Sequence, residues 1–121
     1  MEYLLFIETA AFSKSREALM DEGEFFEFQS WLLEHYELGD TVAGTGGCKK
    51  IRWCRPGSGK SGGLRIIYYV RAASGRIYLL VMYPKNVQEN LTDKQKAQLK
   101  AALESMNAPQ AAGFIYRTRT H

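Results

Sequence analysis

The chain has 121 residues, a net charge of +3 and 45% hydrophobic residues. That length fits one domain with its own core, and no run approaches the roughly 20 apolar residues of a membrane helix. The start also lacks the basic segment of a signal peptide. We therefore expect a single cytoplasmic domain over residues 1–121. Cys48 and Cys54 predict reduced thiols, and with only two histidines the sequence predicts no metal site.

The first half of the chain predicts one strand and two helices. The bulky apolar run Tyr3–Glu8 is typical of a strand. Ser13 is placed to cap a short helix over Lys14–Leu19, and Asp21 to cap a longer helix that ends at Gly39-Asp40. The longer helix has an apolar stripe at helical spacing, which consists of Phe25, Phe28, Leu32 and Tyr36.

The second half predicts three strands and a last helix. The strands cover residues 49–54, 64–71 and 76–83, with a glycine-rich loop over 56–63 between the first two. Thr92 and Gln95 form a capping-box pattern at the start of the helix. The tail, about residues 110–121, has no clear period and stays unassigned. The order β-α-α-β-β-β-α therefore predicts an α+β fold, an antiparallel sheet with its helices on one side.

Charge is distributed unevenly along this one domain. Residues 1–40 contain ten acidic and two basic residues, whereas residues 41–88 contain nine basic residues and no acidic one. Such a segment favours a polyanionic partner, nucleic acid first, although an acidic protein partner or a plain solvated face also fits.

Side-chain alternation predicts which basic residues share a surface. Arg65, Tyr69 and Arg71 point to one side of their strand, and Leu79, Val81 and Tyr83 should share a side of the last strand. If the helices cover the more apolar face, the other face is open. That open face would gather Lys50, Arg52, Arg65, Tyr69 and Tyr83.

Five motifs with a fixed order and spacing carry a family resemblance. They are Gly44-Thr45-Gly46-Gly47, Lys50-Ile51-Arg52-Trp53, Gly62-Gly63-Leu64-Arg65-Ile66-Ile67-Tyr68-Tyr69, Tyr78-Leu79-Leu80-Val81-Met82-Tyr83-Pro84-Lys85-Asn86 and Leu91-Thr92-Asp93-Lys94-Gln95-Lys96. Together they resemble the HigB branch of the RelE/ParE toxin superfamily, from about Phe6 to Met106.

The resemblance implies a small twisted antiparallel sheet flanked by helices. It also implies the toxin of a type II toxin–antitoxin system, which cleaves messenger RNA in the ribosomal A site and thereby inhibits translation. Its implied partners are the ribosome, messenger RNA and a HigA-like antitoxin with a helix-turn-helix domain. Operator DNA would be bound only through that antitoxin, and neither a cofactor nor a membrane is implied.

The resemblance also implies catalytic positions. The basic pair of the family falls on Lys50 and Arg52, its next arginine on Arg65, and its lysine after the last strand on Lys85. Asn86 stands where RelE itself carries an arginine. The tyrosine that RelE carries near its C-terminal helix has no counterpart, so Tyr83 is the candidate for that role.

Cleavage by the 2′-hydroxyl of RNA requires proton transfer and stabilisation of charge on the phosphate. His35 and His121 are too isolated for a two-histidine site, and residues 41–88 lack the carboxylates of a two-metal site. Lysine, arginine and tyrosine remain, which predicts a metal-independent endoribonuclease. The further RNA contacts that we predict are Lys49, Arg55, Lys60, Tyr69 and Arg71.

Two other functions remain open. A ParE-like inhibitor of DNA gyrase would share the fold, but it would not need the cluster of Lys50, Arg52, Arg65 and Lys85. A non-catalytic nucleic-acid-binding module, or an inactivated toxin, would be consistent with Asn86 and with the missing tyrosine.

Overall fold

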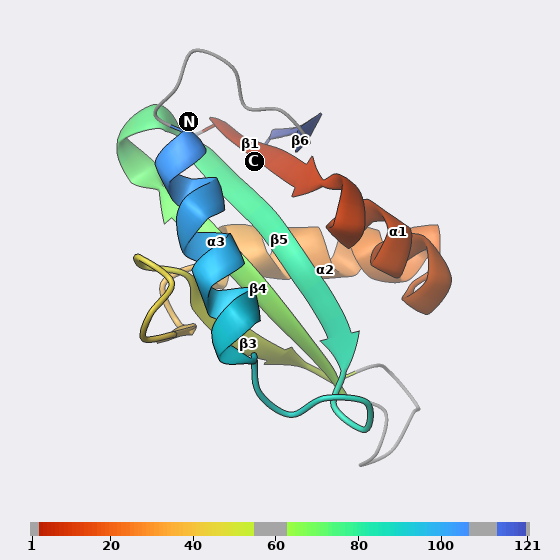
Figure 1. Ribbon diagram of the computed structural model, residues 1–121. Helices are drawn as coiled ribbons and strands as arrows, with labels where there is room; N and C mark the ends of the chain where they lie inside the picture. The colour runs from red at the N-terminus through yellow and green to blue at the C-terminus, as the bar shows by residue number, and fades with distance from the viewer. Residues whose placement is uncertain (1–2, 55–62, 107–113, 121) are drawn as a thin grey trace.

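The computed structural model describes residues 3–54, 63–106 and 114–120 (Figure 1). In this part of the chain the elements are β1 (Tyr3–Thr9), α1 (Ala10–Leu19), α2 (Glu22–His35), β2 (Asp40–Thr41), β3 (Lys49–Trp53), β4 (Leu64–Arg71), a 3-10 turn η1 (Ala72–Ser74), β5 (Arg76–Pro84), α3 (Asp93–Ser105) and β6 (Phe114–Thr120). The α+β class and the predicted order of elements are confirmed. Two strands were not predicted from the sequence, namely the short β2 and the strand β6, which lies in the tail that was left unassigned.

The described strands form one twisted sheet with the order β2-β3-β4-β5-β1-β6. The pairs β3–β4 and β4–β5 are antiparallel, as predicted for strands joined by short connections. The first strand differs, because β1 pairs in parallel with β5 and carries β6 antiparallel on its other side. The tail therefore extends the sheet beyond β1, and β3 lies near the opposite end.

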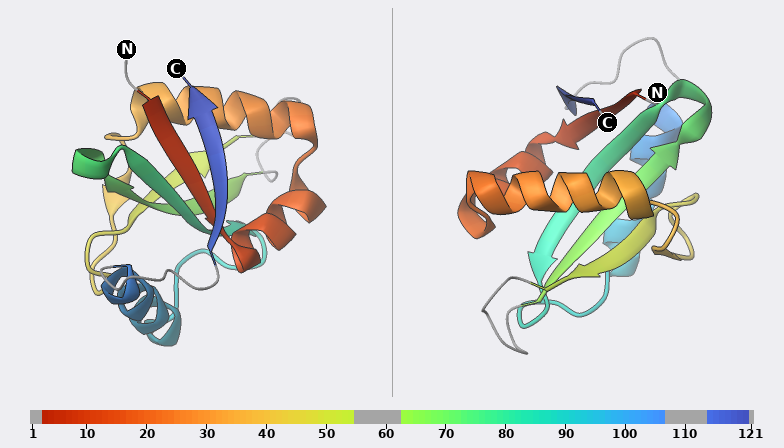
Figure 2. Two further views of the ribbon diagram at one scale, coloured as in Figure 1. Left: turned by 90° about the horizontal axis from the view of Figure 1, so that it is seen from above. Right: turned by 180° about the vertical axis from the view of Figure 1, so that it is seen from behind.

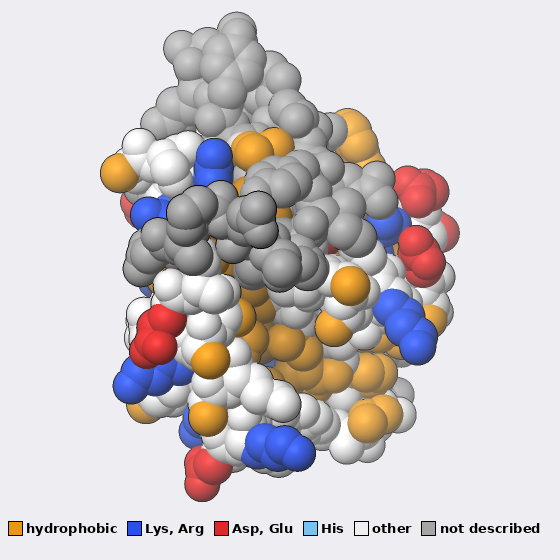
Figure 3. Space-filling view, turned by 45° about the horizontal axis from the view of Figure 1, so that its top comes forward, with side chains coloured by type: hydrophobic (Ala, Val, Ile, Leu, Met, Phe, Trp, Pro, Cys, Tyr) orange, Lys and Arg blue, Asp and Glu red, His pale blue; other side chains and the backbone are white. Residues whose placement is uncertain are grey.

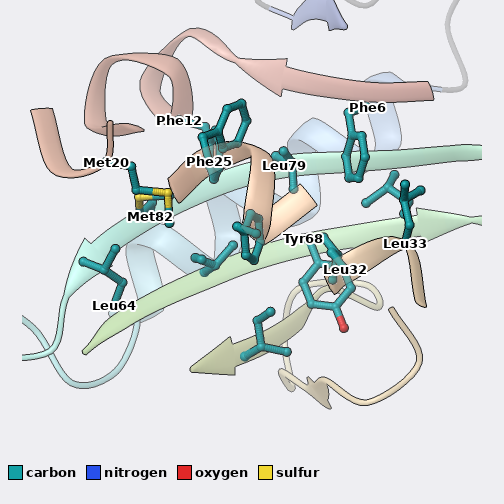
Figure 4. Close-up of a cluster of buried hydrophobic side chains, with 14 residues drawn as sticks. Phe6, Phe12, Met20, Phe25, Leu32, Leu33, Leu64, Tyr68, Leu79 and Met82 are labelled. Atoms are coloured by element: carbon teal, nitrogen blue, oxygen red, sulfur yellow. The ribbon is translucent and has the colours of Figure 1, made fainter. Parts of the chain in front are cut away.

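Helices cover both faces of the sheet (Figure 2). α2 packs on one face, where Phe28 and Leu32 meet Ile66 and Tyr68 in a fully buried core together with α1 (Figure 4). The prediction that all helices lie on one side is wrong. The α3 helix also has an apolar stripe, with Leu99, Leu103 and Met106, and it buries that stripe against Ile67, Tyr78 and Leu80 on the second face. No helix in the described residues is long and apolar enough to cross a membrane.

The caps of the helices follow from short polar side chains. Asp21 Oδ1 accepts a hydrogen bond from the Glu24 amide at 2.7 Å, as predicted. The capping box of Thr92 and Gln95 is also present. The first helix begins earlier than predicted, because Thr9 caps it by accepting from the Phe12 amide at 2.9 Å.

Ser13, which the sequence had placed at the start of the first helix, lies inside α1 instead. Its hydroxyl is buried and donates to the Glu8 carboxylate at 2.9 Å.

A β-bulge in β5 changes which residues share a face. Ile67 pairs with Val81 and Tyr68 with Leu79, so Leu80 is the extra residue of the bulged strand. Leu79 then packs toward α2, whereas Leu80 and Val81 both pack toward α3. The prediction that Leu79 and Val81 share a face with Tyr83 is therefore wrong for Leu79, because the bulge shifts the alternation by one residue.

Candidate functional site

Strand register aligns three of the predicted site residues across the sheet. Arg52 in β3 pairs with Arg65 in β4, and Arg65 pairs with Tyr83 in β5. Residues that are directly opposite in neighbouring strands point to the same face, with strands about 4.8 Å apart. We call Arg52, Arg65 and Tyr83 the cross-strand row. It lies on the face that α3 covers, near the end of β5.

Lys50 and Lys85 extend this row. Lys50 precedes Arg52 by two residues and therefore shares its face of β3. Its Nζ atom donates to Asn90 Oδ1 at 3.2 Å. Lys85 follows the end of β5, where its backbone amide donates to the Gly63 carbonyl at 3.1 Å, and its side chain is exposed. The five predicted catalytic residues therefore lie on neighbouring parts of one face. They are Lys50, Lys85 and the three residues of the cross-strand row.

Arg65 does not lie on an open surface, contrary to the prediction. Its side chain is only 3% exposed, and Nη2 lies 3.0 Å from Glu89 Oε1. The reason is that the second face of the sheet is covered by α3 and by the connection that precedes it. A buried guanidinium needs an anionic partner, and Glu89 provides one.

Glu89 is a site residue that the sequence analysis missed. It lies one position beyond the acid-free segment 41–88, and it brings a carboxylate, half exposed, into the basic cluster. The hydrogen bond from Arg65 is the main cause that lowers the pKa of Glu89, and the charges of Arg65, Lys85 and Arg52 add to it. Glu89 is therefore ionised at neutral pH. A search for the first carboxylate after a basic segment would have found it.

The Tyr83 hydroxyl is buried and has no hydrogen-bond partner among the described residues. Burial raises the pKa of Tyr83, Arg65 opposes this shift, and the Glu89 carboxylate adds to it. The phenol thus stays protonated at neutral pH. Beside Arg65 it can donate a hydrogen bond or a proton, rather than accept a proton.

A cleft of about 460 Å³ opens beside the row, along the outer edge of β3. Its lining combines cationic, anionic and apolar side chains, namely Trp31, Leu38, Asp40, Lys50, Ile51, Arg52, Arg65 and Glu89. β2 pairs only with Lys49 and Lys50, so the strand edge from Ile51 onward has no strand beside it among the described residues. Phosphate chemistry fits this cleft because three cations converge on it.

A second hollow lies on the α3 side, between α1 and α3 (Figure 3). It measures about 320 Å³, and Figure 3 shows hydrophobic side chains along its floor. Among the described residues its lining contains no charged side chain and consists of Thr9, Ala11, Leu80, Val81, Leu91, Gln95, Gln98 and Leu99. The cleft beside β3, which three cations line, is therefore the candidate site.

The structure separates three of the predicted RNA contacts from this cluster. Lys49 points away from Lys50, and its Nζ donates to the carbonyls of Glu37 and Gly39. Tyr69 is partly buried in the α3-side core, and Arg71 lies at the far end of β4 from Arg65.

The predicted contacts Arg55 and Lys60 lie outside the described residues. In the described ranges, no group of three or more His, Cys, Asp or Glu side chains is arranged to hold a metal ion. The metal-independent mechanism stays a prediction. One comparison with known proteins bears on the site: a family model described as the RelE toxin of the RelE / RelB toxin–antitoxin system matches residues 33–114. The matched range contains the whole cross-strand row.

Proposed function

The chain belongs to the RelE toxin family of toxin–antitoxin systems, and from this premise we propose that it is a ribosome-dependent messenger RNA endoribonuclease of the HigB-like branch. By cutting messages in the ribosomal A site it would inhibit translation. The single observation that supports this proposal most strongly is the cross-strand row, because two arginines and a protonated phenol stand side by side on one face.

The proposed reaction uses the 2′-hydroxyl of RNA as nucleophile. Its oxygen attacks the neighbouring phosphorus, and the bond from phosphorus to the 5′-oxygen breaks. The products are a 2′,3′-cyclic phosphate and a 5′-hydroxyl. Arg52 and Arg65, with Lys85, neutralise the charge that grows on the phosphate oxygens. Tyr83 is the proposed proton donor to the leaving 5′-oxygen, and because its hydroxyl is buried in the free protein, the groups that cover it must move when RNA binds.

Glu89 holds Arg65 in place before the substrate arrives. A phosphate that binds Arg65 must either take the position of this carboxylate or lie beside it against like charge. Because Glu89 is half exposed and Arg65 is buried, the carboxylate is the partner that can move into water. Lys50, two residues from Arg52, is the proposed acceptor of the 2′-proton, a step for which its side chain must be in the neutral amine form. The cross-strand row contains no histidine. In this proposal the ribosome aligns the message in the site and thereby raises the rate of cleavage.

The proposed partners follow from this activity. A cell that carries a message-cutting enzyme needs a protein that neutralises it, and we propose a HigA-like antitoxin with a helix-turn-helix domain. Operator DNA would be contacted only through that antitoxin. The ribosome places the site of action in the cytoplasm.

Expression in cells tests the function. We expect incorporation of labelled methionine to fall within minutes of induction, while DNA synthesis continues. The control is the Arg71→Ala variant, which keeps the row and should arrest translation like the wild type. A fall of DNA synthesis that precedes any loss of translation would instead support a gyrase inhibitor.

A further inference from the structure

The cleft beside the cross-strand row has a second wall that the proposed reaction does not use. The lining divides into two chemical groups, the cations Lys50, Arg52 and Arg65 on the one hand and Trp31, Leu38 and Ile51, which we call the apolar wall, on the other. We propose that this apolar wall binds one unstacked nucleobase of the RNA substrate, next to the phosphate held by the arginines. This inference rests on the proposed RNA cleavage, since it names how that substrate is held.

Trp31 is a fixed, partly exposed ring in this wall. It stacks on His35 with ring centroids 4.8 Å apart, and it makes an edge contact with Trp53 with ring centroids 6.1 Å apart. The Nδ1 atom of His35 lies 2.9 Å from the Trp31 carbonyl, and Trp53 Nε1 donates to Glu24 at 3.0 Å. An aromatic ring that its neighbours already hold loses little conformational entropy when a base packs against it.

Leu38 is an unusually exposed apolar side chain on the same wall. It is 66% exposed and lies between the end of α2 and the start of β2. Contact with a flat apolar ligand would remove this side chain from water, which is favourable in proportion to the area buried. Leu38 therefore contributes a contact that costs the free protein no packing.

The two walls together match a nucleotide better than other ligands. A nucleotide joins a flat, largely apolar base to an anionic phosphate, and the cleft is lined by both apolar and cationic side chains. Its volume of about 460 Å³ is in the range of sites for small ligands. Proteins that recognise single-stranded RNA commonly splay out bases and stack them on aromatic rings.

Asp40 adds a preference among bases. Asp40 is exposed and lines the same cleft, and the oxygens of a carboxylate accept hydrogen bonds. Adenine, cytosine and guanine carry an exocyclic amino group that can donate to it, whereas uracil carries none. We therefore expect the site to favour an amino-bearing base over uracil.

Tryptophan fluorescence tests the site without any cleavage. Trp31 and Trp53 are the two tryptophans of the chain, so the Trp53→Phe variant reports on Trp31 alone. The probe is a 2′-O-methyl RNA tetranucleotide of adenine and cytosine, which lacks the nucleophile. We expect saturable quenching of Trp31 at the concentrations at which anisotropy shows binding, and weaker binding of the uracil tetranucleotide. Binding that leaves Trp31 fluorescence unchanged, or no binding at all, would overturn the proposal.

A matched pair of variants checks the wall itself. Leu38→Ser should weaken binding of the adenine and cytosine probe several-fold, and Trp31→Ala by about tenfold, the usual effect of losing one stacked base. Phe26→Ser removes another exposed apolar side chain, 55% exposed, from α2 outside the cleft, and should leave binding unchanged. Equal affinities for Leu38→Ser and Phe26→Ser would contradict the proposal. Because this probe cannot be cleaved, failure of the base site and failure of catalysis are separate results.

Discussion

Glu89 Oε1 lies 3.0 Å from Arg65 Nη2, so the guanidinium at the centre of the cross-strand row already holds an anion before RNA arrives. The two partners are unequal, because Arg65 is buried and Glu89 is half exposed. Glu89 and its neighbour Asn90 together engage two of the proposed catalytic residues, Arg65 and Lys50. The connection between β5 and α3 is therefore a part of the site.

The first prediction concerns competition between Glu89 and phosphate. Glu89→Gln keeps the shape of the side chain and removes its charge, so RNA should bind about two- to fivefold more tightly, the scale of an ion pair with one partner in water. Anisotropy with a non-cleavable RNA measures this. If Glu89 instead took the 2′-proton, Glu89→Gln would bind RNA equally well and lose at least about 10²-fold in cleavage rate.

The second prediction concerns acid stability. The hydrogen bond from Arg65 lowers the pKa of Glu89 below its ordinary value of 4.5. Its contribution to stability is therefore fully present above that value, and it is lost as the pH falls through the lower pKa of the folded state. Between about pH 5 and pH 3, urea unfolding should show a larger loss of stability for the wild type than for Glu89→Gln. Glu104→Gln, an exposed carboxylate on α3, should behave like the wild type.

The third prediction separates the chemistry of Tyr83 from its packing. Tyr83→Phe removes a buried hydroxyl that has no partner among the described residues, so thermal stability should stay equal or rise slightly. Loss of the proton donor should slow cleavage by about 10²-fold or more. Tyr78→Phe, on the same strand, should retain activity. A Tyr83→Phe protein with wild-type cleavage would remove Tyr83 from the mechanism.

The fourth prediction concerns salt. Each phosphate contact on single-stranded RNA contributes about −0.7 to the slope of log affinity against log salt. Lys85→Ala should therefore make the slope shallower by about 0.7. Lys94→Ala, which removes an exposed lysine at the start of α3, should leave it unchanged. Equal slopes for Lys85→Ala and the wild type would show that Lys85 contacts no phosphate.

The sequence predicted elements whose signals are local. Strand β4 was predicted at its observed bounds, and the caps Asp21 and Thr92 were found by residue type and spacing alone. The alternation within β4 also correctly placed Arg65 and Ile66 on opposite faces of the sheet. These features depend on residues close in the chain, so no knowledge of the tertiary structure was needed.

The errors come from contacts between distant segments. The bulge at Leu80 has no glycine or proline to mark it, so the faces of β5 were assigned one residue out of step. The position of α3 over the second face depends on tertiary packing, and this cover turned an expected open surface into a buried Arg65. Glu89 was missed because its role depends on a contact with Arg65, 24 residues away in the chain.

The most direct test of the central claim is the cleavage rate of a ribosome-bound message with Arg65→Ala, measured by primer extension beside Arg71→Ala on the same strand. We expect cleavage to fall by about 10²–10³-fold in Arg65→Ala, the usual effect of removing one charge-stabilising donor, and to stay at the wild-type rate in Arg71→Ala. Circular dichroism at the assay temperature must show that Arg65→Ala is folded. If it is not, Arg65→Gln, which also removes the charge, is measured in its place. A folded Arg65 variant that cleaves the message at the wild-type rate would contradict the account.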